Sequence, residues 1–250
     1  MLLLYYITDR RQFPGNEQQK RERLLAKIGE ATRCGVDYVQ LREKDLSSRD
    51  LLELTRAAVT AMKEASAPAA AISDQTSRIK NSKLLINSRI DVALAARADG
   101  VHLTSSDISA SDARAAWSKA AAATGQWQPG EFTIAVSCHT TAEVRLAESH
   151  GADFAVFAPV FEKVAAPQRP GIGLDALREA CRYEGRPHGP EGVGASRMPV
   201  LALGGVTLEN AGACMAAGAA GIAAIRIFQD HDIREVMARF RPAVMQRDTV

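Results

Sequence analysis

Eight times along this 250-residue chain, a short apolar segment typical of a buried strand is followed by a segment with helical periodicity. The predicted strands are residues 2–8, 37–42, 83–87, 100–103, 132–137, 154–160, 200–203 and 221–225. The helical segments that follow them are residues 17–34, 47–65, 90–96, 108–121, 141–150, 174–183, 207–217 and 232–240. Eight such units in a chain of this length favour a closed parallel barrel over an open doubly wound sheet.

The predicted fold is therefore α/β, a (β/α)8 TIM barrel that occupies residues 1–250 as a single domain. No linker divides the chain. Three predicted loops interrupt the alternation, at residues 69–82, 122–130 and 184–197, and the last of them is rich in Gly and Pro. In a barrel of this kind the active site lies at the C-terminal ends of the strands, so candidate residues are sought there.

The overall charge and the cysteines limit the classes of function. A net charge of +2 with no long basic run argues against a nucleic-acid partner. No apolar run reaches the length of a membrane span, and the apolar start of the chain is interpreted as a first strand rather than a signal peptide. The four cysteines are scattered without metal-ligand spacing, which predicts reduced packing thiols in a cytoplasmic protein. A homo-oligomer is compatible with the sequence.

The seventh predicted strand ends in two glycines, Gly204 and Gly205, ahead of a helix for which Thr207 is the predicted N-cap. A strand, a glycine turn and a helix N-terminus form a good anion site, and a tight turn without a ligand is the alternative. Arg226, at the end of the eighth strand, would complete a phosphate site of the kind that barrels build after strands seven and eight. The alternative for Arg226 is a surface ion pair with Asp230 or Asp232.

The second strand ends in a cationic segment. Gln40, Arg42 and Lys44 alternate, so they are predicted to share one face of the strand. If that face lines the barrel, a guanidinium fork and an ammonium group are well suited to a diphosphate. The alternative is an exposed strand end at which Glu43 and Asp45 neutralise the two cations.

Three further strand ends carry polar residues, and each is open to two interpretations. Asn87 is either a ligand contact or a turn residue. Asp107 is either a ligand of Mg2+, which prefers carboxylate, water and phosphate oxygens, or the N-cap of the following helix. His139 is either a base or an exposed loop residue, and Thr140 is a predicted helix cap.

These strand-end segments resemble the thiamine-phosphate synthase and TenI family. The matching segments are YITD (6–9), VQLREK (39–44), LINSRIDVAL (85–94), ADGVHL (98–103), VSCHT (136–140), GADF (151–154), PVF (159–161) and PVLALGGV (199–206). The resemblance covers nearly the whole chain in order. It implies a TIM barrel that acts in thiamine biosynthesis on small phosphorylated substrates.

In the synthase, a hydroxymethylpyrimidine diphosphate is joined to a thiazole phosphate and diphosphate is released. The resemblance implies a dissociative transferase reaction that depends on cations and Mg2+ to hold the leaving group. The residues that match are Gln40, Arg42, Lys44 and Asn87 for the pyrimidine diphosphate, Ser137 for the diphosphate, Asp107 for Mg2+, and Gly205 for the thiazole phosphate. Of these, Arg42, Lys44 and Ser137 are the candidate catalytic residues.

The chain departs from the synthase pattern at three places. Ser88 stands where the synthase usually has a second magnesium aspartate, so water and phosphate would have to complete the ion's shell. After the sixth strand, the synthase's Thr-x-Thr-Lys segment is absent. Lys163 is the one cation near that position, and it is the candidate substrate contact there. At the end of the eighth strand, Arg226 stands where the synthase pattern has a small residue.

The sequence leaves two alternatives to the synthase open. Phe161 and Glu162 resemble the pattern of the TenI thiazole tautomerase, although the tautomerase histidine position is Pro159 here, as in the synthase. A catalytically silent barrel that binds a phosphorylated ligand for regulation is the third hypothesis. The spacing of Gln40, Arg42 and Lys44, together with Asp107 and Pro159, favours the synthase.

Overall fold

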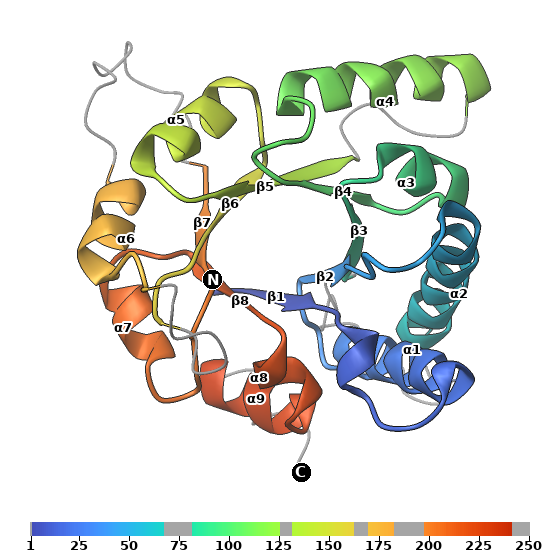
Figure 1. Cartoon of the computed structure of the whole chain (residues 1–250), viewed down its shortest axis with the longest axis horizontal. Coiled ribbons are helices and arrows are strands. Elements are labelled where there is room, and N and C mark those ends of the chain that lie inside the picture. The colour runs from blue at the N-terminus through green and yellow to red at the C-terminus, as the bar shows by residue number, and fades with distance from the viewer. Residues whose placement is uncertain (1, 68–81, 126–131, 163–169, 183–197, 242–250) are drawn as a thin grey trace, which may run out of the picture.

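The computed structural model describes residues 2–67, 82–125, 132–162, 170–182 and 198–241. Eight parallel strands form a closed barrel in sequence order, and β8 pairs with β1 to complete the ring. Viewed down the barrel, the helices lie outside the strands as an outer ring (Figure 1). The predicted α/β barrel is therefore confirmed.

The elements follow the predicted alternation closely. The strands are β1 Leu3–Ile7, β2 Tyr38–Leu41, β3 Lys83–Asn87, β4 Gly100–Leu103, β5 Thr133–Cys138, β6 Phe154–Phe157, β7 Val200–Ala202 and β8 Gly221–Ala224. The helices are η1 Arg10–Gln12, α1 Glu17–Arg33, α2 Ser48–Ser66, α3 Ile90–Ala96, α4 Ala110–Thr124, α5 Thr141–Ser149, α6 Leu174–Cys181, α7 Ala211–Ala216, α8 Arg226–Gln229 and α9 Ile233–Phe240. Across the described ranges, every helix is too short or too polar to traverse a bilayer.

The structure corrects the predictions for three helices, α7, α8 and α4. Thr207 Oγ1 accepts the backbone N–H groups of Glu209 and Asn210 at 3.3 Å, so it caps a turn, and the regular helix α7 begins only at Ala211. The short helix α8 was not predicted, because β8 ends at Ala224 and the chain turns directly into it. The predicted loop 122–130 is wrong at its start, since α4 continues to Thr124. Residues 69–81, 126–130 and 184–197 of the predicted loops lie outside the described residues.

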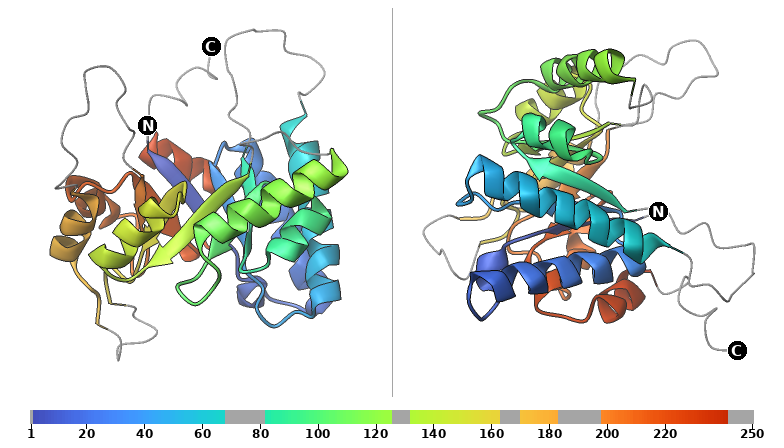
Figure 2. Two further views of the ribbon diagram at one scale, coloured as in Figure 1. Left: turned by 90° about the horizontal axis from the view of Figure 1, so that it is seen from above. Right: turned by 90° about the vertical axis from the view of Figure 1, so that its right-hand side faces the viewer.

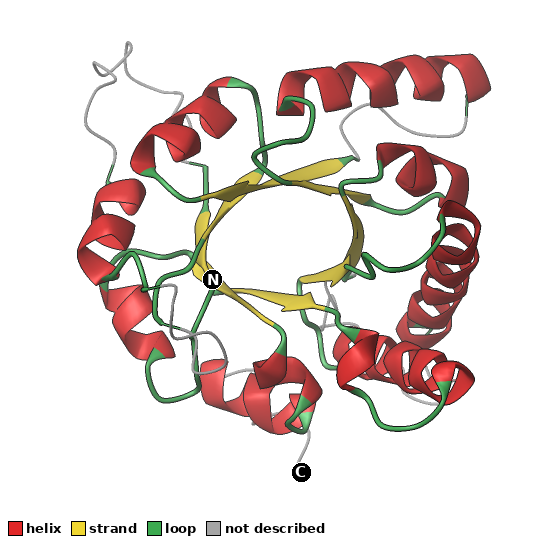
Figure 3. Cartoon of the chain, in the orientation of Figure 1, coloured by secondary structure: helices red, strands yellow, loops and turns green. Residues whose placement is uncertain are grey.

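Two apolar layers stabilise the barrel. Its interior is filled by a buried cluster that includes Tyr5, Leu85, Phe154 and Leu201. A larger layer lies between the strands and the surrounding helices, which Figure 3 shows as red coils around the yellow strands. Side views show the helices lying alongside the wall of the barrel (Figure 2). The interior side chains close the barrel from within, so a ligand site has to form at its mouth.

An aspartate precedes three even-numbered strands and makes the same pair of hydrogen bonds in each case. Its carboxylate accepts the backbone N–H of a residue in the preceding strand, and its own N–H donates to that residue's carbonyl. The pairs are Asp37 with Leu4, Asp99 with Leu84 and Asp153 with Ile134, with N–H to carboxylate distances of 2.8, 2.7 and 2.7 Å. Ala220 occupies this place before β8. The aspartates set the strand register at the N-terminal end of the barrel, opposite the mouth formed by the C-terminal ends of the strands.

Candidate active site

A chain of hydrogen-bonded side chains crosses the C-terminal ends of β2, β3 and β4. Gln40 is 2% exposed, and its Nε2 donates to Asn87 Oδ1 at 2.9 Å. Asn87 Nδ2 donates to Ser88 Oγ at 3.0 Å, and Ser88 Oγ donates to Asp107 Oδ2 at 2.7 Å. The structure thus brings together three of the predicted site residues through Ser88, which stands where the family resemblance places an aspartate.

Asp107 is held firmly by one of its two carboxylate oxygens. Besides the Ser88 hydroxyl, Oδ2 accepts the backbone N–H of Thr104 at 2.6 Å and the Thr104 hydroxyl at 2.9 Å. The alternative interpretation of Asp107 as a helix N-cap is wrong, because Ser109 caps α4. Oδ1 accepts no hydrogen bond from the described residues, so Asp107 presents one free carboxylate oxygen at the mouth.

This donor set suits Mg2+ only in part. The described residues contain no group of three or more His, Cys, Asp or Glu side chains that could hold a metal ion. Mg2+ does not need such a cage, because it keeps several waters and is often held by one or two carboxylates together with substrate phosphates. The free Oδ1 of Asp107 fits that role, and Ser88 leaves the ion with one carboxylate where the resemblance implies two.

A second hydrogen-bonded chain joins the barrel interior to β5. The Tyr5 hydroxyl lies 3.0 Å from His102 Nδ1, and His102 Nε2 lies 2.7 Å from Ser137 Oγ. Burial, and next the nearby positive charge of Arg42, lower the pKa of His102 to about 3, so this imidazole is neutral at physiological pH. Neither Tyr5 nor His102 was predicted as a site residue, although a histidine within a four-residue buried strand was a signal for this pair.

The two cations after β2 do not share a strand face as predicted. The strand ends at Leu41, so the alternation stops before Lys44, which lies exposed in a turn. Arg42 is half-buried, and its backbone N–H donates to Thr8 Oγ1 at 3.0 Å. Its guanidinium makes no hydrogen bond or ion pair with the described residues, and its charge acts on His102. Arg42 is therefore a free cation beside the site.

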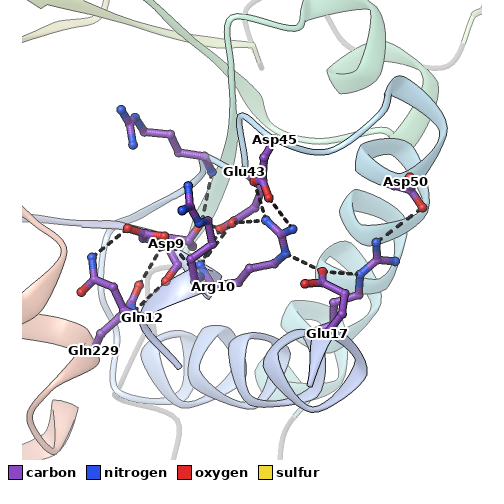
Figure 4. Close-up of polar contacts among 12 residues, drawn as sticks. Asp9, Arg10, Gln12, Glu17, Glu43, Asp45, Asp50 and Gln229 are labelled. Carbon is purple, nitrogen blue, oxygen red and sulfur yellow. Dashed lines mark hydrogen bonds and ion pairs between the residues drawn. The ribbon is translucent and has the colours of Figure 1, made fainter. Parts of the chain in front are cut away.

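The acidic neighbours of these cations pair with a different arginine (Figure 4). Arg10, which is 3% exposed, donates from Nη1 to Glu43 at 3.0 Å and to Asp45 at 2.7 Å, and from Nε to Glu17 at 2.6 Å. The alternative interpretation, in which Glu43 and Asp45 neutralise Arg42 and Lys44, is therefore wrong. The signal missed in the sequence was Arg10, which begins η1 three residues after the end of β1.

Arg10 favours the ionised form of both Asp45 and Glu43, and burial opposes that effect at Glu43. The hydrogen bond from Arg10 lowers the pKa of Asp45 to about 2. Burial raises the pKa of Glu43, and its hydrogen bonds from Thr8 and Arg10 oppose that rise. Thr8 donates to Glu43 at 2.6 Å and accepts from Arg42, so the network fixes the backbone that carries Arg42.

The two glycines after β7 are required by the packing of the neighbouring loop. Gly204 and Gly205 have φ values of 94° and 63°, and a Cβ on either would lie 2.7 Å from Pro159 or Phe161. Their N–H groups and that of Val206 donate to none of the described residues. The turn is therefore needed for packing and also presents free donors.

Arg226 lies exposed at the start of α8, just after β8, and β8 pairs with β7, the strand that precedes this glycine turn. No ion pair joins it to Asp230 or Asp232 in the described part of the chain. His139 is an exposed loop residue whose Nδ1 lies 2.6 Å from the carbonyl of Ala158, and Thr140 caps α5 as predicted. Lys163 lies outside the described residues.

The fold and the gathered polar residues define a (β/α)8 barrel with its candidate site at the carboxyl ends of the strands, as in barrel enzymes. A family model described as thiamine monophosphate synthase matches residues 4–228. This chain belongs to that family.

Individual relatives agree with the family model. A putative thiamine-phosphate synthase of Geobacter sulfurreducens is 38% identical over 93% of this chain and 89% of its own length. A thiamine-phosphate synthase of Methanoculleus marisnigri is 32% identical over 89% of this chain and 85% of its own. The solved thiamine phosphate pyrophosphorylase from Pyrococcus furiosus superposes with a TM-score of 0.65 at 26% identity, over 96% of this chain and 94% of its own.

Proposed function

We propose that this protein is a thiamine-phosphate synthase, a transferase of thiamine biosynthesis that joins hydroxymethylpyrimidine diphosphate to thiazole phosphate and releases diphosphate. The observation that carries the proposal is the hydrogen-bonded chain from Gln40 through Asn87 and Ser88 to Asp107, beside the free cation of Arg42. Membership of the thiamine monophosphate synthase family supports it.

Arg42, Lys44 and Ser137 are the proposed catalytic residues, because they hold the leaving group. Negative charge builds up on the diphosphate as its bond to the pyrimidine breaks, and preorganised donors stabilise that charge most effectively. Arg42 is half-buried and its guanidinium pairs with none of the described residues, so it can bind two phosphate oxygens without first breaking an ion pair to them. Lys44 adds a second cation from the adjacent exposed turn.

Gln40 and Asn87 are the proposed pyrimidine contacts. Their mutual hydrogen bond fixes the orientation of both side-chain amides, with the Gln40 NH2 group facing the Asn87 oxygen. After that bond is made, Gln40 retains its carbonyl oxygen and one N–H, which complement the amino group and ring nitrogen of an aminopyrimidine. The pair would therefore orient the ring at the mouth.

The turn at Gly204 and Gly205 is the proposed site of the thiazole phosphate. Its free backbone N–H groups can donate to phosphate oxygens, and Arg226 on the neighbouring strand end supplies a positive charge. Lys163, which lies outside the described residues, is a further proposed contact. This arrangement would place the two substrates on opposite sides of the barrel mouth.

Mg2+ is the proposed cofactor, and Asp107 would hold it through the free Oδ1. When bound, the ion neutralises charge on the diphosphate. The role of this chain's own residues is to keep that oxygen available, since Thr104 and Ser88 occupy only Oδ2.

A Ser88→Asp variant tests this assignment. It would place a carboxylate within hydrogen-bond distance of Asp107, so it would lower the thermal stability of the metal-free protein by like-charge repulsion. Mg2+ would relieve the repulsion, and we expect its apparent affinity to rise about tenfold. Thermal unfolding with and without Mg2+ measures both effects, and Ser88→Ala is the matched control that adds no charge. Equal Mg2+ stabilisation of the Asp and Ala variants would contradict the assignment.

The proposed setting is the cytoplasm, where the free cysteines of the described residues stay reduced. The proposed partners are small phosphorylated substrates. The test is an assay of purified protein with both substrates and Mg2+, each omitted in turn. Isomerisation of the thiazole without use of the diphosphate would identify a tautomerase, and phosphate binding without turnover would identify a regulator.

A further inference from the structure

A fully buried tyrosine reaches the proposed diphosphate site through one histidine. Tyr5 has no exposed surface and packs in the barrel interior against Tyr38 and Phe154. His102 is 2% exposed, and its two ring nitrogens contact the Tyr5 hydroxyl at 3.0 Å and Ser137 Oγ at 2.7 Å. Ser137 is half-buried at the end of β5. The three side chains therefore connect the core to the mouth.

The position of the protons in this chain follows from what surrounds Tyr5. A neutral imidazole has one N–H donor and one acceptor nitrogen. If Nδ1 carried the proton, the Tyr5 hydroxyl would accept it, and the hydroxyl's own proton would face an apolar core. His102 is the one hydrogen-bond partner of that hydroxyl among the described residues. An unsatisfied buried donor is costly, so the Tyr5 hydroxyl donates to Nδ1 and the imidazole carries its proton on Nε2.

This tautomer leaves the Ser137 hydroxyl free to act as a hydrogen-bond donor. Its oxygen accepts the Nε2 proton of His102, so its own hydroxyl proton has to point to another acceptor. We propose that Tyr5 and His102 are positioning residues that hold Ser137 as a hydrogen-bond donor toward an anionic substrate oxygen. This inference rests on the proposed function, in which that oxygen belongs to the diphosphate.

The charged groups around His102 agree with this orientation. Arg42 and Asp107 are the two whose charges act on the imidazole, and neither is hydrogen-bonded to it in the described structure. The positive charge of Arg42 acts on His102, the residue that contacts Ser137, and it favours an anion in that vicinity. A charged imidazole would carry an N–H on Nδ1 as well, and Nδ1 could then not accept the Tyr5 hydroxyl proton. Burial keeps the imidazole uncharged, so Nδ1 stays an acceptor.

The first test is the tautomer of His102 in the free protein, measured by nitrogen-15 NMR with His102→Gln used to assign its signals. We expect the proton on Nε2 in the wild type and a loss of that single tautomer in Tyr5→Phe. Tyr38→Phe is the matched control, since it removes a hydroxyl from the same aromatic cluster. A proton on Nδ1, or on both nitrogens, in the wild type would overturn the inference whether or not the protein has synthase activity.

The second test is the binding of inorganic diphosphate by calorimetry. We expect Tyr5→Phe to weaken binding about fivefold, toward the value for Ser137→Ala, and Tyr38→Phe to change it less than twofold. In the synthase assay, Tyr5→Phe should lower kcat more than it raises KM, because the donor matters most as the charge on the leaving group grows. Equal binding by the two tyrosine variants would overturn the inference. A wild type with the expected tautomer and diphosphate binding but no condensation would reject the proposed function alone.

Discussion

An Arg10→Ala variant should lose about 3–5 kcal/mol of folding free energy at neutral pH, because it leaves Glu43 buried without its cation. Glu43 is 4% exposed and receives hydrogen bonds from the Arg10 guanidinium and the Arg10 backbone. The backbone contacts survive the substitution, whereas the guanidinium contact does not. The loss should also loosen Thr8, and with it the backbone of Arg42.

The loss of stability in Arg10→Ala should depend on pH. Burial already raises the pKa of Glu43 in the folded protein, and removing Arg10 takes away one of the groups that oppose the rise. A carboxyl whose folded pKa is raised destabilises the fold as the pH rises above its unfolded value of about 4.3. The pKa of Asp45, which Arg10 holds at about 2, also returns upward, and that stabilisation is lost at high pH as well. The deficit is therefore largest above neutrality and shrinks as the pH falls, and it is smallest near pH 2, where Asp45 begins to be protonated in the wild type as well.

Urea unfolding of the wild type and Arg10→Ala at several pH values measures this effect. Arg11→Ala is the matched control, since Arg11 is the next residue, is exposed, and has no ion pair among the described residues. We expect the control to stay within about 0.5 kcal/mol of the wild type. A deficit in Arg10→Ala that equals the control, or that grows toward acid pH, would contradict the network as described.

An Arg42→Ala variant should lose about 10²–10³-fold in kcat, the usual effect of removing one preorganised donor from a developing anion. The guanidinium has no ion pair among the described residues, so its loss should change the folding free energy by less than about 0.5 kcal/mol. Arg42→Lys keeps the charge but not the two-pronged geometry, and it should fall between the wild type and the alanine variant.

Steady-state kinetics of the condensation, with thermal unfolding in parallel, separate the two effects. Arg33→Ala is the matched control, because Arg33 is exposed in the last turn of α1 at the opposite end of the barrel. Unchanged kinetics in Arg42→Ala would remove this residue from the site. A loss of activity that merely follows a loss of stability would give Arg42 a structural role.

The strand and helix pattern could be predicted because it depends on local periodicity and on caps. Ser47 and Thr140 cap the helices that follow them, and the apolar β7 is buried along its whole length. The start of α7 and the short helix α8 could not be predicted in the same way. Both depend on single turns whose hydrogen bonds leave little trace in residue spacing.

The charged pairs of the site could be predicted least well. Sequence proximity paired Glu43 with Arg42 and Lys44, but the barrel brings Arg10 from the preceding strand end to the same carboxylate. A pairing of this kind depends on the register between β1 and β2, which local sequence does not contain. The positive φ of Ser88 is a further example, because the adjacent residues do not indicate a left-handed backbone conformation at this position.

Gln40, Asn87 and Asp107 were predicted at the ends of their strands, and the structure joins them through Ser88. Tyr5 and His102 were given no role, because each lies inside a predicted strand and not after its end. Their importance depends on the closed barrel, in which residues from β1, β4 and β5 meet across the interior.

The measurement that tests the central claim most directly is the formation of thiamine phosphate by the purified wild-type protein. The protein would be given hydroxymethylpyrimidine diphosphate, thiazole phosphate and Mg2+, and both products would be quantified. Our account predicts thiamine phosphate and diphosphate in equal amounts, with neither formed when either substrate is omitted. A folded protein that binds diphosphate but forms no thiamine phosphate would contradict it.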